Sequence, residues 1–288
     1  MKKIVVTGAN GYLASFIQSH NKERFEFIPV TRKEVDLENT EQVNTYFSTL
    51  EFDAVLHTAA RAQTLDCETN PIDTHKVNVE SAIALANICK QKGARFIFLS
   101  TEQVFNNKQI AAPFHETDTV NSTTVYGNHK IEVEEYLLAQ QIDTVILRLS
   151  WMMGLSYPGV HAGPNIIKNV LDSLLYNRPT YFTVNETRGL TYAKNLATHF
   201  EVLTTLPAGI YHFSSTNEKN TYEAAKYIAQ TLGFDTKTID QIILPDTKRY
   251  ADHHRNLRLA TEKLEHHGIP MATFEEDVRA CLNDFGYQ

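Results

Sequence analysis

The chain has 288 residues, of which 42% are hydrophobic and 21% are charged, and its formal net charge is −7. These proportions are ordinary for a globular protein, and an acidic balance without a basic block argues against a nucleic acid polymer as the main partner. No apolar run approaches the ~20 residues that cross a bilayer, so we expect no membrane partner. Three sparse cysteines do not indicate a disulfide framework, which favours a cytoplasmic location.

Short apolar runs alternate with helical runs through the first half of the chain. Strands are predicted at Lys3–Thr7, Glu26–Thr31, Ala54–Ala60, Arg95–Ser100 and Thr144–Ser150, and helices at Tyr12–His20, Thr40–Leu50, Ile72–Lys92 and Lys130–Gln140. This alternation is typical of an α/β protein with a Rossmann-type, doubly wound parallel sheet that carries helices on both faces. We expect residues 1–153 to form this domain, with part of the later chain returning to it.

The alternation loosens after about Gly154. Further helices are predicted at Asn165–Tyr176, Thr221–Gly233 and Thr273–Phe285, with irregular segments between them. Residues 154–288 are therefore expected to form mainly a smaller C-terminal α/β lobe.

The first predicted strand runs directly into the sequence TGANGYLA. Gly8 permits a sharp turn, Gly11 leaves room for a pyrophosphate, and Ala14 is small enough for the helix to pack on the strand. Backbone N–H groups near Tyr12 and Leu13, at the start of the helix, would face the phosphates. An ordinary tight turn is the alternative, but the position between a strand and a helix favours a dinucleotide-binding loop.

The end of the second predicted strand bears on the choice of cofactor. It reads Val30, Thr31, Arg32 and Lys33, with two cations and a hydroxyl and no carboxylate at the tip. A carboxylate there usually binds the ribose 2′-hydroxyl of NAD, whereas cations attract the 2′-phosphate of NADP. We therefore predict contacts from Thr31 and Arg32 to NADPH, with NADH as the second candidate; the alternative is that the cations are solvated loop charges.

Three residues form a candidate catalytic set. Thr101 follows the predicted strand Arg95–Ser100, and Tyr126 and Lys130 stand four residues apart in a helical run, so that both lie on one helix face. Lys130 and an oxidised nicotinamide ring would lower the pKa of the Tyr126 phenol and suit it to proton transfer near neutral pH. A tyrosine and a lysine at this spacing are often a surface pair, but the glycine turn and the order Thr, Tyr, Lys favour catalysis.

Several segments, in this order, resemble those of extended short-chain dehydrogenases/reductases, and more narrowly those of the dTDP-4-dehydrorhamnose reductase family. They are TGANGYLA, VTRKEVDLEN, FDAVLHTAA, the TNPxxxxxVNV stretch at 69–79, GARFIFLSTEQVF, VYGNHKIEVEEYL, ILRLSWMMG, LTYAKNLA, GIYHFSS and NLRLATEKL. The resemblance implies a Rossmann-type sheet with a C-terminal substrate-binding lobe. It also implies hydride transfer from NAD(P)H to the 4-keto group of a nucleotide-linked deoxysugar, a reaction of dTDP-rhamnose and other carbohydrate biosynthesis.

The same resemblance implies roles for individual residues. Tyr126 would donate a proton to the developing alkoxide, Lys130 would bind the nicotinamide ribose, and Thr101 would orient the carbonyl. Further cofactor contacts are implied at Asp36, Leu37, Ala59, Ala60 and Arg61.

The substrate side departs from the family pattern. Trp151 matches a residue near the sugar, but Gln103 stands where the family has a tyrosine, and a neutral Gln103 cannot act as the base of the related sugar dehydratases. Arg188 is the favoured ligand for a substrate diphosphate, since a guanidinium matches phosphate oxygens, with surface pairing as the alternative. The other arginines considered for this role are Arg249, Arg255 and Arg258.

No metal site is expected, because the paired histidines at 253–254 and 266–267 lack ligand spacing. Two other functions stay open. The chain could be a non-catalytic NADP-binding regulatory subunit similar to the β-subunit of S-adenosylmethionine synthetase, or a reductase or epimerase of a non-nucleotide substrate. A homodimer is also compatible with the sequence.

Overall fold

The computed structural model describes residues 1–107 and 112–287. The described residues form two compact units, each assembled from separate parts of the chain. One unit lies within Met1–Gln109, Glu116–Leu149 and Leu196–Tyr211, and the other lies within Ile110–His115, Ser150–Asn195 and His212–Gln288.

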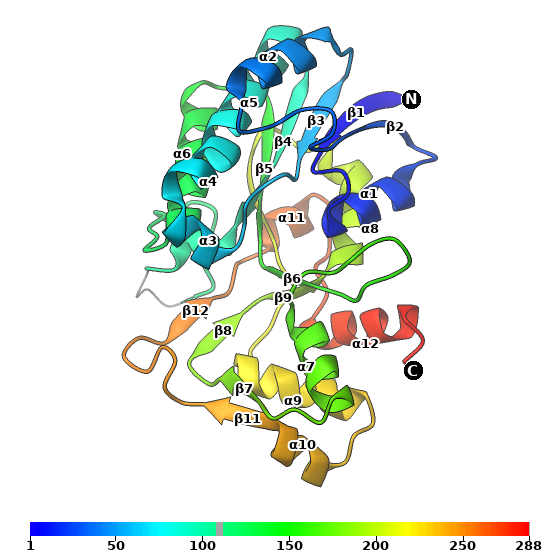
Figure 1. The fold of residues 1–288 in the computed structure, drawn as a ribbon, viewed down its shortest axis with the longest axis vertical. Helices are drawn as coiled ribbons and strands as arrows, with labels where there is room; N and C mark the ends of the chain where they lie inside the picture. Colours follow the sequence, from blue (N-terminus) through cyan, green and yellow to red (C-terminus); the bar gives the residue numbers. More distant parts are fainter. Residues whose placement is uncertain (108–111, 288) are drawn as a thin grey trace. The chain divides into compact units, whose positions relative to one another are not determined.

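The first unit is built on a six-stranded sheet (Figure 1). Its strands are β1 (Lys2–Thr7), β2 (Phe25–Val30), β3 (Ala54–His57), β4 (Arg95–Thr101), β5 (Thr144–Leu149) and β10 (Gly209–Phe213), in the order β10-β5-β4-β3-β1-β2. The pairs from β2 through β5 are parallel. β3 and β5 are buried at every position, as strands covered on both faces must be. The predicted Rossmann-type sheet is confirmed.

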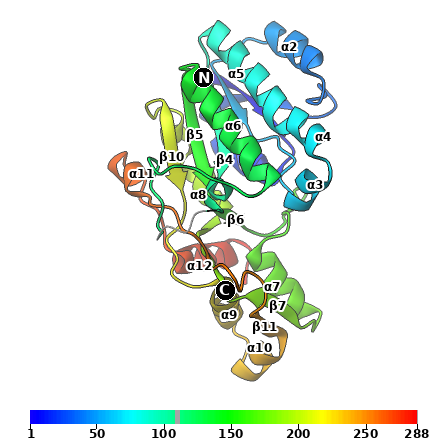
Figure 2. The same ribbon diagram turned by 90° about the vertical axis from the view of Figure 1, so that its left-hand side faces the viewer.

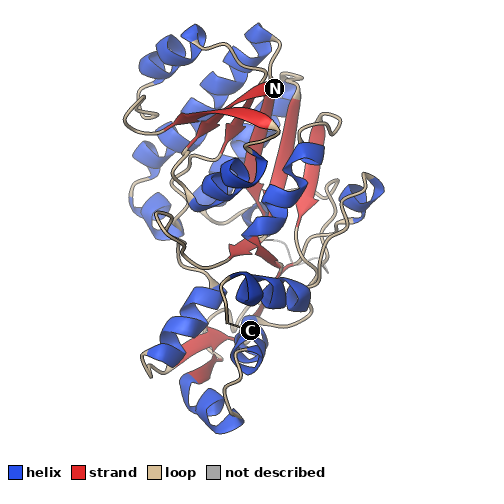
Figure 3. Ribbon diagram, turned by 90° about the vertical axis from the view of Figure 1, so that its right-hand side faces the viewer, coloured by secondary structure: helices blue, strands red, loops and turns tan. Residues whose placement is uncertain are grey.

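Helices cover both faces of this sheet. α1 (Tyr12–Asn21) and α8 (Ala193–Leu203) lie on one face (Figure 3), and α2 (Thr40–Thr49), α5 (Ser81–Lys92) and α6 (Val125–Ala139) lie on the other (Figure 2). The core between the sheet and the second face contains apolar side chains such as Phe47, Leu85 and Val133. β2 lies on one side of β1 and β3 on the other, so the direction in which successive strands are added to the sheet reverses at β1. Folds of this kind bind ligands at such a point, outside the carboxyl ends of the strands.

Two helix predictions need correction. The helix expected at Ile72–Lys92 is divided into α4 (Pro71–His75), a π-helical turn η1 (Lys76–Glu80) and α5, after a further short helix α3 (Thr64–Thr69). The helix expected from Lys130 begins at Val125, because the Thr124 hydroxyl accepts a hydrogen bond from the Gly127 N–H at 3.1 Å and caps the helix there. Tyr126 therefore lies in the first turn of α6.

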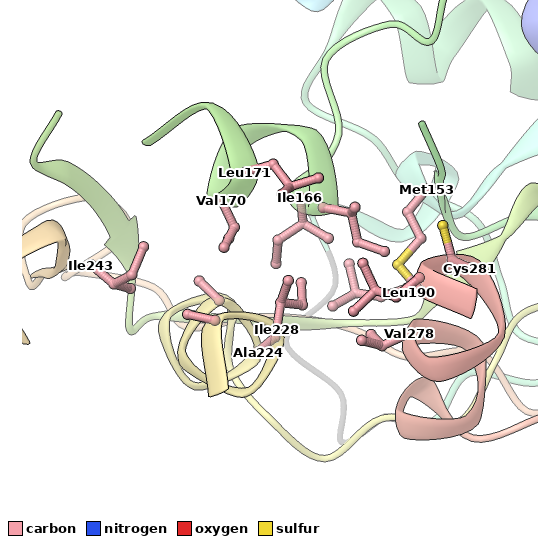
Figure 4. Close-up of a cluster of buried hydrophobic side chains, with 14 of the residues drawn as sticks. Met153, Ile166, Val170, Leu171, Leu190, Ala224, Ile228, Ile243, Val278 and Cys281 are labelled. Carbon is pink, nitrogen blue, oxygen red and sulfur yellow. The ribbon is translucent and has the colours of Figure 1, made fainter. Parts of the chain in front are cut away.

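The second unit contains three two-stranded parallel sheets. They pair β7 (Thr180–Thr183) with β11 (Ile243–Asp246), β8 (Glu186–Arg188) with β12 (Arg255–Leu257), and β6 (Trp151–Met153) with β9 (Leu190–Tyr192). Its helices are α7 (Ile166–Leu175), α9 (Thr221–Thr231), α10 (Thr236–Ile242), α11 (Glu262–His266) and α12 (Phe274–Asp284). Buried side chains of α7, α9 and α12, among them Val170, Ile228 and Val278, form its core (Figure 4).

Within the described part of the chain, no helix combines the length and the apolar character that a membrane span needs. The three cysteines are buried, unpaired thiols.

Candidate active site

The turn between β1 and α1 has the geometry expected of a phosphate-binding loop. Gly8 has a φ of +63°, and a Cβ atom added there would lie 3.0 Å from both the N and Cα atoms of Ala59, so neither the conformation nor the space admits a side chain. Gly11 forms the N-cap of α1, donates its N–H to the Gly8 carbonyl at 2.8 Å, and supplies no capping side chain. α1 thus begins at a glycine-lined turn in which no side chain caps the helix, and this turn fits a pyrophosphate.

The segment after β3 packs against this turn. β3 ends at His57 rather than at Ala60, and the Thr58 hydroxyl donates to the Thr7 carbonyl at 2.7 Å. Ala59 and Ala60 follow in a partly exposed loop. Ala59 and Ala60, both predicted to contact the cofactor, therefore lie in a loop that packs against Gly8 through Thr58 and Ala59.

Asn78 fixes the end of that loop. Its side-chain oxygen accepts the Arg61 N–H at 2.8 Å, and its side-chain nitrogen donates to the Arg61 carbonyl at 3.0 Å. Asn78 lies in the π-helical turn and is 1% exposed. Asn78 belongs to the quoted stretch at 69–79, but no role was predicted for it, although an asparagine between two valines in an apolar helical run is an unusual buried polar group that needs partners.

The Arg61 side chain is held by carboxylates. Its guanidinium donates two hydrogen bonds to Asp66, at 2.8 and 2.7 Å, and lies 3.8 Å from a Glu38 oxygen. The hydrogen bonds from Arg61 hold the pKa of the Asp66 carboxyl below its usual value. Nearby, Asp36 is exposed and accepts the Glu38 N–H, while Leu37 is partly buried.

The interpretation of the second strand's tip needs correction. Glu34 folds back, and one of its carboxylate oxygens accepts both the N–H and the hydroxyl hydrogen of Thr31, each at 2.7 Å. A carboxylate does therefore stand at the tip of β2, contrary to the sequence-based expectation, while Arg32 and Lys33 are exposed beside it. Sequence reasoning considered only the residues directly after the strand and so missed a side chain that returns from three positions further on.

Tyr126 and Lys130 do share one face of α6. The Lys130 ammonium lies 5.8 Å from the centre of the Tyr126 ring and 4.5 Å from that of Phe98, and it donates to the Leu99 carbonyl at 2.8 Å. Lys130 is 3% exposed, and this burial lowers its pKa to about 8. Thr101, at the end of β4, accepts the Gln103 N–H through its hydroxyl at 3.2 Å and thereby starts the 3₁₀ helix η2 (Glu102–Phe105).

The pKa expectation for Tyr126 is wrong for the protein alone. Burial raises the pKa of its phenol well above the usual value. Tyr126 is thus a protonated hydrogen-bond donor at neutral pH, a state that suits a general acid.

Gly127 explains how α6 approaches η2. A Cβ atom at Gly127 would lie 2.8 Å from the Gln103 carbonyl oxygen and would overlap the Ser122 hydroxyl. Only a glycine after Tyr126 allows the helix to start this close to η2, which begins directly after Thr101.

A buried ion pair anchors the same helix to the sheet. Arg148 of β5 and Glu134 of α6 are each 3% exposed at their side chains, and the closest contact between their charged atoms is 2.7 Å. The Ser100 hydroxyl donates to the same carboxylate. Glu134 lies one helical turn beyond Lys130, so the pair fixes the rotation of α6 that points Lys130 toward the sheet.

The predicted substrate residues of the second unit also meet. The Arg188 guanidinium lies 5.0 Å from the centre of the Trp151 ring and 3.6 Å from a Glu186 carboxylate oxygen. Arg255 approaches the other oxygen of Glu186 at 3.2 Å, and Arg249 and Arg255 both lie over the ring of Tyr250, at 5.0 and 4.5 Å.

The Arg188 side chain is mostly buried beside these other arginines. Burial, together with the charges of Arg255 and Arg249, lowers the pKa of Arg188 to about 9. Arg258 does not join the cluster but pairs with Glu218. Two of the four arginines considered from the sequence, Arg188 and Arg255, therefore pair with one buried carboxylate, and Arg249 shares the Tyr250 ring with Arg255, an arrangement suited to an anionic ligand.

No group of three or more histidine, cysteine, aspartate and glutamate side chains within residues 1–107 and 112–287 is arranged to hold a metal ion.

The family described as the RmlD substrate binding domain matches residues 1–287. The chain belongs to this family. Membership confirms the resemblance predicted from the sequence. Among curated relatives, the spore coat polysaccharide biosynthesis protein SpsK of Bacillus subtilis is 29% identical over 273 residues, 94% of this chain and 92% of that protein.

Two further comparisons extend over nearly the whole family fold. A dTDP-4-dehydrorhamnose reductase of Sinorhizobium fredii is 26% identical over 294 residues, 97% of this chain and 96% of that protein. The crystal structure of a dTDP-4-dehydrorhamnose reductase of Bacillus anthracis in complex with NADP superimposes with a TM-score of 0.85 at 21% identity, and covers 98% of this chain and 99% of that one. The structural likeness supports the fold.

Proposed function

We propose that the protein is an NAD(P)H-dependent reductase of a nucleotide-linked 4-keto-deoxysugar, with dTDP-4-dehydrorhamnose as the first substrate to test. The observation that carries this proposal is the pairing of Tyr126 with a buried Lys130 at the carboxyl end of β4. The names of the Sinorhizobium and Bacillus anthracis relatives support the same reaction class.

The residues of the first unit fit a dinucleotide. Gly8 and Gly11 leave the space that a pyrophosphate needs, and the backbone N–H groups of Tyr12 and Leu13, in the first turn of α1, would donate to it. Further contacts to the dinucleotide are proposed from Thr31, Arg32, Asp36, Leu37, Ala59, Ala60 and Arg61. We propose NADPH as the main cofactor, with NADH as the second.

The chemistry divides between the cofactor and the side chains. Bound NAD(P)H would supply the hydride that reduces the carbonyl carbon. Tyr126 holds its proton at neutral pH and donates it to the carbonyl oxygen as negative charge develops there, so that an alcohol forms. Lys130 lies next to the phenol, where a positive charge stabilises the phenolate that remains, and Thr101 donates a hydrogen bond that orients the carbonyl.

Each unit also has groups suited to parts of such a substrate. The arginine cluster around Glu186, with Arg188 against Trp151, suits a diphosphate beside a flat or apolar sugar face. Gln103 contributes an amide for sugar hydroxyls and no acid–base function, which favours reduction over water elimination.

The test is NADPH oxidation with dTDP-4-dehydrorhamnose and related 4-ketosugars, comparing the wild type with Tyr126→Phe. The matched control is Tyr136→Phe, which removes a phenol hydroxyl from the same helix, where it donates to Asn87 at 2.9 Å. We expect kcat to fall by roughly 100-fold or more in the Tyr126 variant, as loss of a general acid does, and to change little in the control.

NADPH binding without turnover of any ketone would contradict the proposal. It would favour the non-catalytic regulatory function considered from the sequence.

A further inference from the structure

The tip of β2 lies beside the glycine turn. The Ala9 N–H, one residue after Gly8, donates to the carbonyl of Val30, the last residue of β2, at 3.2 Å. Thr31 follows directly. In a Rossmann-type fold the ribose next to the adenine is read at this tip, so groups on Thr31 are the ones a 2′-hydroxyl or 2′-phosphate meets.

The polar groups of Thr31 are already engaged. Its N–H and its hydroxyl both donate to one oxygen of Glu34 at 2.7 Å, and the hydroxyl also accepts the Lys33 N–H at 3.2 Å. A phosphate that sought the same two donors would have to displace the Glu34 carboxylate from them.

Charge acts in the same direction. The hydrogen bonds from Thr31 hold the pKa of Glu34 below its usual value, so the carboxylate is ionised at neutral pH. Arg32 and Lys33 attract a doubly charged 2′-phosphate, whereas Glu34 repels it at close range. An uncharged 2′-hydroxyl meets no such repulsion, and it can donate to the second Glu34 oxygen, which the two hydrogen bonds from Thr31 do not use.

We propose that Glu34 is a cofactor-selecting residue: its carboxylate competes with the 2′-phosphate for Thr31 and so limits the preference for NADPH, allowing the site to accept NADH as well. This inference rests on the proposed dinucleotide-binding function. It assigns opposite effects to neighbouring side chains, since the two cations favour the phosphate and Glu34 opposes it.

The test is the dissociation constants of NADPH and NADH, measured by isothermal titration calorimetry for the wild type and for Glu34→Gln. The glutamine amide keeps an acceptor oxygen for Thr31 but removes the charge. The control is Glu41→Gln, which removes an equal charge from an exposed position in the first turn of α2, where no contact with Thr31 exists.

The Glu34 substitution should raise the ratio of the NADH constant to the NADPH constant by roughly three- to tenfold at low salt, and by less at high salt because the charges are exposed. The control should leave the ratio within about twofold of the wild type, since Glu41 is exposed and it is Glu34 that engages the Thr31 donors. An unchanged or lower ratio in the Glu34 variant, with both dinucleotides bound, would overturn the role of Glu34 and leave the proposed function intact. Failure of the wild type to bind either dinucleotide would overturn both.

Discussion

Two glycines with the same backbone conformation allow the contact at the phosphate-binding turn to be measured separately. Gly8 has a φ of +63° and Gly93, which ends α5, has a φ of +66°. A Cβ atom at Gly93 would meet no atom within 4 Å, whereas one at Gly8 would lie 3.0 Å from two backbone atoms of Ala59. Gly93→Ala therefore introduces backbone strain alone, and Gly8→Ala introduces the same strain plus a collision.

The expected magnitudes follow from these geometries. A left-handed conformation costs a non-glycine residue about 1–2 kcal/mol, which should be the whole effect at Gly93. The collision at Gly8 involves backbone that cannot rotate away, so we expect about 1–3 kcal/mol more, in the range of overpacking costs. Because the displaced backbone belongs to the loop proposed to contact the cofactor, the NADPH dissociation constant should rise at least about tenfold, or 1.4 kcal/mol.

Urea denaturation measures the free energy of unfolding of both variants, and calorimetric titration measures NADPH affinity. Gly93→Ala should bind NADPH as the wild type does. If the two variants lost equal stability, and both kept wild-type affinity, the contact between Gly8 and Ala59 would have no energetic role and the reasoning would be refuted.

Two other predictions concern buried polar groups. Asn78→Ala removes both hydrogen bonds to the Arg61 backbone, which should cost about 1–3 kcal/mol of stability and weaken NADPH binding. Asn87→Ala is the control and should leave NADPH binding unchanged. Equal NADPH affinities of the two variants would argue against a role of the Asn78–Arg61 hydrogen bonds in holding the loop. Burial raises the pKa of Asp277 to about 6, so its contribution to stability is present below pH ~4 and is lost as the pH rises through about 6. Thermal unfolding between pH 4 and pH 7 should show this slope for the wild type and lack it for Asp277→Asn, and a slope that persisted in the variant would exclude Asp277 as its source.

The sequence predicted the sheet and its first glycine turn because both are encoded locally. β-branched runs such as that of β1, and the spacing of Gly8 and Gly11, are visible within a few residues. The shared face of Tyr126 and Lys130 also follows from helical spacing alone.

Contacts between distant segments could not be predicted in this way. The hydrogen bonds between the Asn78 side chain and the Arg61 backbone join residues 17 positions apart. The pairing of Glu134 with Arg148 depends on the rotation of α6 on the sheet. The raised pKa of Tyr126 reflects burial by surrounding segments, which a helical pattern does not reveal.

The small sheets of the second unit were missed for a different reason. Strands of three or four residues, such as β8 and β9, are too short to show an alternating pattern. The arginines there were noted individually, but their gathering around Glu186 depends on the pairing of β8 with β12.

Transfer of deuterium from NADPH labelled at C4 of the nicotinamide tests the central claim most directly. Incubation with dTDP-4-dehydrorhamnose, followed by mass spectrometry of the nucleotide-sugar product, should reveal one deuterium on the new carbinol carbon and stoichiometric NADP⁺. An unlabelled and unreduced sugar recovered from protein saturated with the cofactor would contradict the account.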